Sequence, residues 1–308
     1  MRAIFGAAIV LALLAAGPVE AQTKITVSYG PGYPWMPAFV AKDEGIFAKH
    51  GLDVTLQFIA IGSNQPAALI AGTSQIAGLN PTIVLFADEG GADLQIVAGA
   101  NGQAKTGSSG GAIARTGLTI KSPADYRGKK IGVPGLQSVI HIAFMKWLKD
   151  RGIDPGSVTF IEVPINRMND ALKNGQIDIA LPAAPFTDQI LAAKSGTLVA
   201  DYQADLADPF TIYSAWAMTR SFKAAHPDVA PAFKQSLREA IDFIGKNEKE
   251  ARKTLVTYLH LPEQVAMSVG LGTFTADMTA AQMQWWVDAC KQLGLSKGTV
   301  PLKDMVAE

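Results

Sequence analysis

Short apolar runs alternate along the chain with longer stretches whose apolar residues recur at helical spacing. The run Ile131-Gly132-Val133 predicts a short buried strand. A segment that begins at Ser138 then carries its large apolar residues on one helical face: Ile140, Phe144, Trp147 and Leu148. Residues 158–163 are again rich in β-formers. Because strands and helices alternate, we expect an α/β protein with parallel sheets and helices on both faces.

A weak internal repeat divides the sequence into two similar halves. Four segments of the first half recur in the same order in the second half. They are Lys24–Val27 with Lys130–Val133, Gly51–Asp53 with Gly152–Asp154, Ala68–Gly72 with Ala171–Gly175, and Ile76-Ala77 with Ile179-Ala180. Asn166 is expected to cap the helix before Gly175, and Ser63 or Asn64 the corresponding helix of the first half. The repeat predicts two α/β lobes.

The segments between and after the two copies predict how the lobes are joined. Residues 94–114 begin as a strand and become rich in Gly, Ser and Asn, which suits a crossing between lobes, and residues 210–218 are the candidate return. The later amphipathic stretches, 229–260 and 280–293, should pack back on the first lobe. We therefore expect lobe one to contain residues 24–112 plus 217–308 and lobe two residues 113–216.

Composition narrows the function classes. The chain has 308 residues, with 48% apolar, 18% charged and a formal net charge of zero, which disfavours nucleic acid as a partner. Its single cysteine, Cys290, permits no intramolecular disulfide and suits a core position. The four histidines show no metal-ligand spacing: His50, His141, His226 and His260. We expect no catalytic residues, no metal and no cofactor.

The first 21 residues have the order of an export signal. Arg2 precedes an apolar run from Ile4 to Ala16, and Gly17-Pro18 breaks that run before small residues that end at Ala21. This predicts a signal peptide over residues 1–21, cleaved to release a mature protein into the periplasm. The alternative is a membrane anchor, for which the apolar run is about half of the ~20 residues a spanning helix needs.

Ligands of open parallel sheets bind beyond the carboxyl ends of the strands, so two facing sheets predict a cleft between lobes. Several of the expected cleft loops lead into helix N-termini, whose free N–H groups suit an anion. The polar candidates for ligand contact are Ser63, Asn64, Asn80, Gln137, Ser138 and Asn166. The alternative for the Ser and Asn residues is a simple N-cap or turn role.

Aromatic residues in the same loops are candidates for covering an apolar ligand body. Tyr33 and Trp35 lie in a Gly/Pro-rich loop after the first strand, and Phe186 follows the Pro-rich turn 182–185. The alternative is that they pack on the next helix. Arg167 is the single arginine of the cleft loops and is expected either to pair with a ligand anion or to be solvated.

Several motifs together resemble a known family. They are Ala38–Phe47 (AFVAKDEGIF), Gly51–Val54, Gly62-Ser63 with Ala68–Gly72, Tyr126–Val133 (YRGKKIGV) and Asn247–Ala251. Over essentially the whole mature chain, the sequence is similar to the substrate-binding proteins of nitrate/sulfonate/taurine-type ABC importers, a group that includes thiamine-pyrimidine-type binders. The resemblance implies a type II periplasmic binding protein fold, lobes that close on ligand, docking on a membrane permease, and no catalysis.

Two departures from the family pattern bear on the ligand. No acidic residue stands in Thr73–Ala77, where many relatives have one, and the loop Gly30–Pro37 is bulkier than an inorganic oxyanion requires. Both favour an organic ligand with an apolar body over nitrate.

The resulting hypothesis is a monomeric solute-binding protein. It captures a small organic anion, a carboxylate or sulfonate that is aromatic or aliphatic, and delivers it to an inner-membrane ABC permease. Two alternatives stay open: an enzyme on the same fold acting on a small heterocyclic or aromatic metabolite, and a sensory ligand-binding module.

Overall fold

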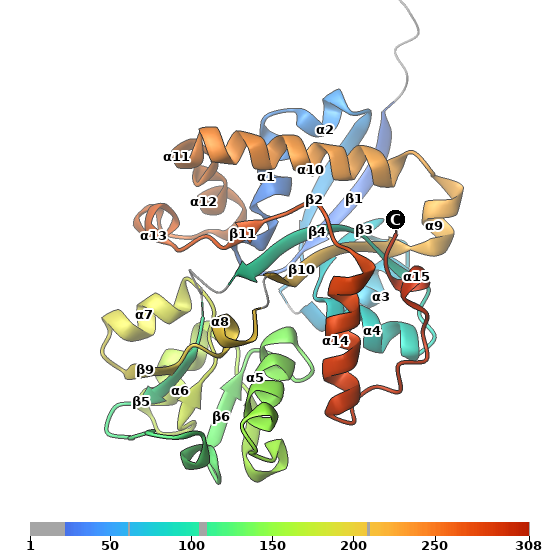
Figure 1. Ribbon diagram of the computed structural model, residues 1–308. Coiled ribbons are helices and arrows are strands. Elements are labelled where there is room, and N and C mark those ends of the chain that lie inside the picture. Colours follow the sequence, from blue (N-terminus) through green and yellow to red (C-terminus); the bar gives the residue numbers. More distant parts are fainter. Residues whose placement is uncertain (1–21, 61, 105–109, 208–209, 308) are drawn as a thin grey trace, which may run out of the picture.

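The computed structural model describes residues 22–60, 62–104, 110–207 and 210–307, and of Ser63 it describes the main chain alone. The predicted α/β class is confirmed, because the described residues form two mixed sheets with helices packed on both (Figure 1). The predicted signal peptide, residues 1–21, lies outside the described part of the chain. No helix in these four ranges is both long and apolar enough to cross a membrane.

The larger sheet has six strands in the order β11-β4-β10-β3-β1-β2. Its strands β1, β2 and β3 are parallel, whereas β10 runs antiparallel to β3 and β4. The bounds are β1 Thr23–Tyr29, β2 Leu52–Phe58, β3 Ile76–Leu79, β4 Leu94–Ala104, β10 Phe210–Thr219 and β11 Thr273–Phe274. We call this sheet with the helices packed on it the first lobe.

The smaller sheet has five strands in the order β7-β6-β8-β5-β9 and, with its helices, forms the second lobe. Strand β6 is parallel to β7 and β8, and β5 is antiparallel to β8 and β9. The bounds are β5 Ala112–Arg115, β6 Lys130–Val133, β7 Thr159–Glu162, β8 Ile179–Ala180 and β9 Gly196–Ala200. The order β7-β6-β8 repeats the order β2-β1-β3, which confirms that the sequence repeat is structural.

Helices cover both faces of each sheet, and their apolar sides form separate clusters. On the first lobe, one face carries α1 Met36–Asp43, α2 Ile46–Lys49, α10 Val229–Lys246 and α12 Lys253–Leu259. The other carries α3 Gln65–Ile70, α4 Pro81–Glu89, α14 Ala280–Gln292 and α15 Leu302–Met305. On the second lobe, α5 Val139–Asp150 and α8 Tyr202–Leu206 face away from α6 Met168–Lys173 and α7 Phe186–Ala192.

The remaining helices are short and lie between these elements. They are α9 Arg220–Ala225, α11 Glu248–Ala251, α13 Glu263–Ser268 and the 3-10 turns Tyr33–Trp35, Gly62–Asn64, Pro123–Tyr126, Pro155–Ser157 and Ile165–Arg167. Gly175 follows α6 with φ of 66°, the left-handed conformation expected of a residue that ends a helix.

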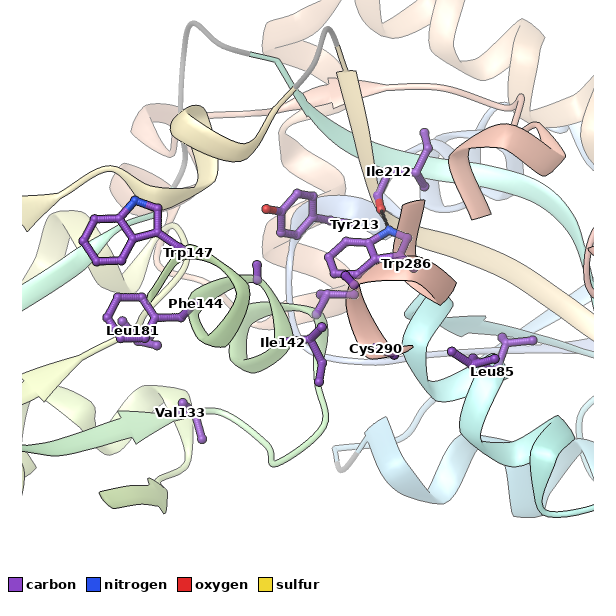
Figure 2. Packing of buried hydrophobic residues seen from close by; sticks show 14 of the residues in the cluster. Leu85, Val133, Ile142, Phe144, Trp147, Leu181, Ile212, Tyr213, Trp286 and Cys290 are labelled. Atoms are coloured by element: carbon purple, nitrogen blue, oxygen red, sulfur yellow. Dashed lines mark hydrogen bonds between the residues drawn. The ribbon is translucent and has the colours of Figure 1, made fainter. Parts of the chain in front are cut away.

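The apolar core continues from one lobe into the other on the α14 side. The late helices were expected to pack on the first lobe, and α10 and α14 do so, but α14 also contacts α5 of the second lobe. Figure 2 shows Leu85 of α4, Trp286 and Cys290 of α14, and Ile142 and Phe144 of α5 in one cluster. Cys290 is fully buried, as predicted, and the indole of Trp286 donates to the carbonyl of Ile212 at 2.7 Å. The lobes are therefore held together along this side.

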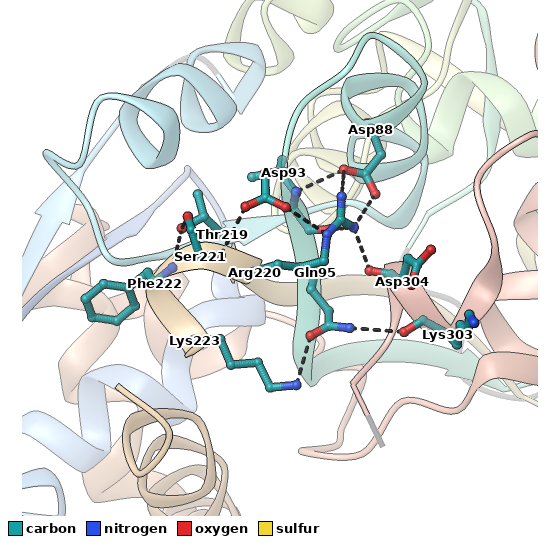
Figure 3. A network of polar contacts seen from close by, with 11 residues as sticks. Asp88, Asp93, Gln95, Thr219, Arg220, Ser221, Phe222, Lys223, Lys303 and Asp304 are labelled. Carbon is teal, nitrogen blue, oxygen red and sulfur yellow. Dashed lines mark hydrogen bonds and ion pairs between the residues drawn. The ribbon is translucent and has the colours of Figure 1, made fainter. Parts of the chain in front are cut away.

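A polar network centred on Arg220 holds helix α15 against the first lobe, where β4 begins and β10 ends (Figure 3). Arg220, the first residue of α9, forms ion pairs with Asp88 at 3.0 Å and Asp93 at 2.8 Å. The same guanidinium donates to the main-chain carbonyls of Leu94 and Asp304. One side chain of α9 thus ties together α4, β4 and α15.

Candidate functional site

Two buried N–H donors meet where β1 ends. Gly30 directly follows this strand, and an atom at the Cβ position of Gly30 would lie 3.8 Å from Nε2 of Gln65 and 3.9 Å from Nε1 of Trp35. Both nitrogens are inaccessible to solvent and neither has a hydrogen-bond partner among the described residues. Buried donors are normally paired, and an unpaired one costs about 1–3 kcal/mol. The pair therefore marks a position suited to a hydrogen-bond acceptor.

Gln65 is the binding candidate that sequence reasoning missed. It begins α3 and is fully buried, because Ser28 of β1 lies beneath it and donates to Oε1 at 2.5 Å. Pro66 fits the first turn of the helix, where its missing N–H would have no partner within the helix. The available signal was a glutamine placed directly after Ser63 and Asn64, in a helix that starts at the carboxyl end of a strand.

Trp35 was expected to stack on a ligand, but its ring lies in the core of the first lobe. The side chain is 6% exposed, with its benzene portion against Gly78 of β3 and its edge toward Trp216 of β10 at a centroid distance of 4.9 Å. The close approach is possible because Gly78 has no side chain: a Cβ would lie 2.6 Å from the ring. The part of Trp35 left without a partner is the indole N–H.

The other two aromatic candidates lie differently. Tyr33 is 4% exposed and packs edge-on against Phe274 of β11 at 6.2 Å, with its hydroxyl close to Gly272. The Tyr33 ring thus packs within the protein, but against β11 rather than on the next helix as the alternative had it. Phe186 begins α7 and is half-buried. It remains a candidate for covering a ligand from the second lobe.

Two of the expected N-caps are not caps. Asn64 has helical backbone angles, φ −86° and ψ −11°, because the turn Gly62–Asn64 precedes α3, and its exposed side chain accepts no capping bond. Asn166 is exposed within the turn Ile165–Arg167, where the N–H of Arg167 already bonds to the carbonyl of Pro164. The cap position of α6 therefore shifts to Arg167. The side chain of Ser63 lies outside what the structure describes.

Ser138 caps α5, as predicted: its hydroxyl accepts from the N–H of His141 at 3.4 Å. Gln137 beside it has an exposed side chain, and both of its main-chain groups are occupied. Its N–H donates to Nδ1 of His141 at 2.9 Å, and its carbonyl accepts from Thr82 at 3.0 Å. The ligand-facing candidates of this loop are thus the Ser138 hydroxyl and the Gln137 amide.

Asn80 connects the end of β3 to the crossing strand. It takes an extended conformation before Pro81, and its side-chain amide donates to the carbonyl of Tyr213 in β10 at 2.8 Å. Tyr213 in turn has a buried hydroxyl without a partner among the described residues, and its ring meets Trp286 edge-on. Asn80 therefore has a structural role at the junction of the lobes.

The two lobes touch on both sides of the strand ends. On one side, Thr82 of α4 bonds to Gln137, and Lys149 of α5 donates to the carbonyl of Gln292 in α14. On the other side, Ala184, in the loop between β8 and α7, packs into the apolar cluster of the first lobe. In the described arrangement the two lobes are therefore in direct contact at these points.

His141 is neutral at physiological pH. It is 7% exposed, and burial lowers the pKa of its imidazole to about 4. Because Nδ1 accepts from Gln137, the ring proton is on Nε2, which has no partner in the described part of the chain. No three His, Cys, Asp or Glu side chains within the described ranges gather as metal ligands.

Comparison with known proteins identifies the family. A model of the NMT1-like family matches residues 19–260. The chain belongs to this family. It is 29% identical over 232 residues to the taurine-binding periplasmic protein of Escherichia coli K12, an alignment that covers 75% of this chain and 69% of the relative.

Solved structures share the fold at low identity. The alkanesulfonate-binding protein SsuA of Xanthomonas axonopodis pv. citri matches with a TM-score of 0.74, 18% identity and coverage of 93% of this chain and 99% of that one. The aliphatic sulphonate binding protein SsuA of E. coli gives 0.77, 17% identity and 92% of both chains. The nitrate-binding protein NrtA of Synechocystis PCC 6803 gives 0.74, 15% identity, and 93% and 86%.

These findings confirm the predicted type II periplasmic binding fold and the resemblance of the motifs. The relatives that share the family or the fold are named for binding taurine, sulfonates or nitrate.

Proposed function

We propose that this protein captures a small organic anion, a sulfonate or carboxylate, at the strand ends between its lobes and delivers it as a monomer to an inner-membrane ABC permease. The observation that carries the proposal is the convergence of Gln65 Nε2 and Trp35 Nε1, both buried and unpartnered, beside Gly30. A relative that is named for taurine, an organic sulfonate, supports the ligand class.

Neutral N–H donors suffice to hold an anion. A hydrogen bond to a charged group contributes about 1.5–3 kcal/mol, against about 0.5–1.5 kcal/mol for a neutral pair. Each donor beside Gly30 would also be relieved of the cost of being buried without a partner. An oxygen of a sulfonate or carboxylate fits this position because it accepts several hydrogen bonds and donates none.

The lobes supply the two sides of the proposed site. Because β10 belongs to the sheet of the first lobe and β5 to that of the second, we shift the expected bounds and take residues 24–104 plus 210–307 and residues 112–207 as the two bodies that close on ligand. Ser138, Asn166 and Phe186, in the segments that follow β6, β7 and β8, would complete the contacts from the second lobe, and Ser63 and Asn64 would contribute from the first. Residues 1–21 are proposed to be removed on export, which N-terminal sequencing of periplasmic protein would test.

A ligand panel tests the proposal directly. Taurine, ethanesulfonate, propionate, benzoate, nitrate and a pyrimidine are screened by thermal shift, and positives are measured by calorimetry. An organic anion at 100 times its Kd should add about 2.7 kcal/mol to the free energy of unfolding. Ligand binding should also make the closed arrangement dominant in small-angle scattering.

A matched pair of variants locates the site. Gln65→Met keeps the side-chain volume and removes both amide groups, so it should weaken the anion at least tenfold. Gln176→Met makes the same change at an exposed residue of the second lobe and should leave the affinity unchanged. The proposal fails if no organic anion stabilises the protein, or if Gln65→Met binds as tightly as wild type.

A further inference from the structure

We infer that Ser28 fixes the polarity of the Gln65 amide, so that the site selects groups that accept hydrogen bonds and rejects groups that donate them. The inference rests on the proposed function and names the feature that sets ligand class. Ser28 is a positioning residue here: it lies on β1, beneath the start of α3, and acts through Gln65.

The distance between Ser28 Oγ and the Gln65 amide identifies which end of the amide faces the serine. The two heavy atoms are 2.5 Å apart. That separation lies within the range of O–H···O bonds and below that of N–H···O bonds, which begins at about 2.7 Å. The serine hydroxyl therefore donates to Oε1, and Nε2 with its two hydrogens points away from Ser28.

Burial makes this orientation costly to reverse. Ser28 and Gln65 are both fully buried, so water does not compete for either end of the amide. If the amide turned over, the Ser28 hydroxyl would lose its acceptor, and Oε1 would face the position beside Gly30, where it could accept from Trp35 Nε1–H but would repel a bound anion. With an anion at this position, the reverse orientation therefore sets two acceptors against each other and leaves a buried hydroxyl unpaired.

The second donor cannot change polarity at all, because an indole nitrogen donates and never accepts. Trp35 Nε1 and Gln65 Nε2 lie at nearly equal distances from the same point beside Gly30. Trp35 belongs to the apolar cluster of the α1 face, and Gln65 starts the helix on the opposite face. A ligand atom at this point would thus meet donors from both faces of the sheet, which suits an ionised oxygen and disfavours an ammonium or a protonated acid.

Ethanesulfonate is the probe, and NMR of the side-chain amides is the readout. It distinguishes a serine that orients the Gln65 amide from one that only stabilises the fold. In wild type, ethanesulfonate should shift the Gln65 Nε2 resonances, which are assigned by their loss in Gln65→Met. In Ser28→Ala the shift should disappear and the affinity should fall about tenfold. Ser28→Thr keeps a hydroxyl on the strand and should restore both to within a few-fold of wild type.

A double-mutant cycle is a second, independent test of the inference. If Ser28 acts through the amide, Ser28→Ala should have no further effect on ethanesulfonate affinity in a Gln65→Met background. Additive losses, or a normal Nε2 shift in Ser28→Ala, would overturn the inference while leaving anion binding intact. If no organic anion of the panel shifts the Nε2 resonances of wild type, the proposed function and this inference fall together.

Discussion

Thr82 donates from its hydroxyl to the main-chain carbonyl of Gln137 at 3.0 Å, a bond that joins the two lobes. Thr82 lies in the first turn of α4 and is fully buried, whereas Gln137 precedes α5. Gln137 takes a left-handed conformation, with φ of 64°, which costs a residue with a side chain about 1–2 kcal/mol. The bond from Thr82 helps to hold that conformation, and because it joins the two lobes we expect it to break when they separate.

Removing this bond should favour the open arrangement. Thr82→Val keeps the shape of the side chain but leaves the Gln137 carbonyl unpaired, so ligand should bind roughly tenfold more weakly, mainly through faster dissociation. Thr82→Ser should retain most of the affinity. Stopped-flow dissociation rates and small-angle scattering of the liganded protein measure the effect. Identical dissociation from Thr82→Val and wild type would show that the bond does not govern closure.

The buried imidazole of His141 predicts a stability that falls in mild acid. Its folded pKa of about 4 lies below the ordinary value near 6.5, so between these pH values the unfolded chain binds the extra proton. The contribution of His141 to the free energy of unfolding is therefore complete above pH 6.5. It decreases as the pH falls toward 4, by roughly 3 kcal/mol in total. Urea unfolding at pH 7 and pH 4.5 measures the loss.

The matching variant is His141→Gln, which cannot titrate in this range. Its free energy of unfolding should change less between pH 7 and 4.5 than that of wild type, whatever its stability at pH 7. Equal pH dependence in the two proteins would assign the acid sensitivity to other groups.

The local sequence was sufficient to predict features that depend on few residues. The repeat predicted two similar α/β units, and the strand orders around β1 and β6 are equivalent. The N-cap alternative for Ser138 is correct, because capping needs only the next three residues. Asn166 was predicted wrongly because Pro164 accepts a bond one turn early and moves the helix start. Local chemistry alone did not distinguish the two outcomes.

Features that depend on pairing between distant segments were not predictable. The placement of the Trp35 ring requires Gly78 to lie beside it across the sheet, which no local pattern indicates. Gln65 becomes a buried, oriented donor only because Ser28, on a strand 37 residues earlier, lies beneath it. The strand ends were identified from sequence, whereas the groups presented there depend on sheet register and packing.

Trp35→Phe separates the two roles that the structure assigns to Trp35. The phenyl ring should still cover Gly78 and face Trp216, but Nε1–H is lost, so anion affinity should fall about tenfold with a smaller loss of stability. Trp35→Ala should instead cost about 3–5 kcal/mol of folding free energy, because it empties a core position. Calorimetry and urea unfolding of both variants are the measurements. Unchanged affinity in Trp35→Phe would show that the indole N–H does not contact the ligand.

Arg220 should be the most important ion-pairing residue for the stability of the first lobe. The Asp88 side chain is 1% exposed, and burial raises the pKa of its carboxyl, while the Leu94 N–H and the Arg220 guanidinium act in the opposite direction. Arg220→Met would leave this carboxylate without its ion partner and free the carbonyl of Asp304, at a cost of about 3 kcal/mol in urea unfolding.

Arg238→Met is the matched control, because the Arg238–Asp277 pair is 47% and 59% exposed and should contribute at most about 1 kcal/mol. Adding Asp88→Asn to Arg220→Met should recover part of the lost stability, since the unpaired charge is then removed. Equal losses of stability in the two arginine variants would show that burial of Asp88 does not strengthen its dependence on Arg220.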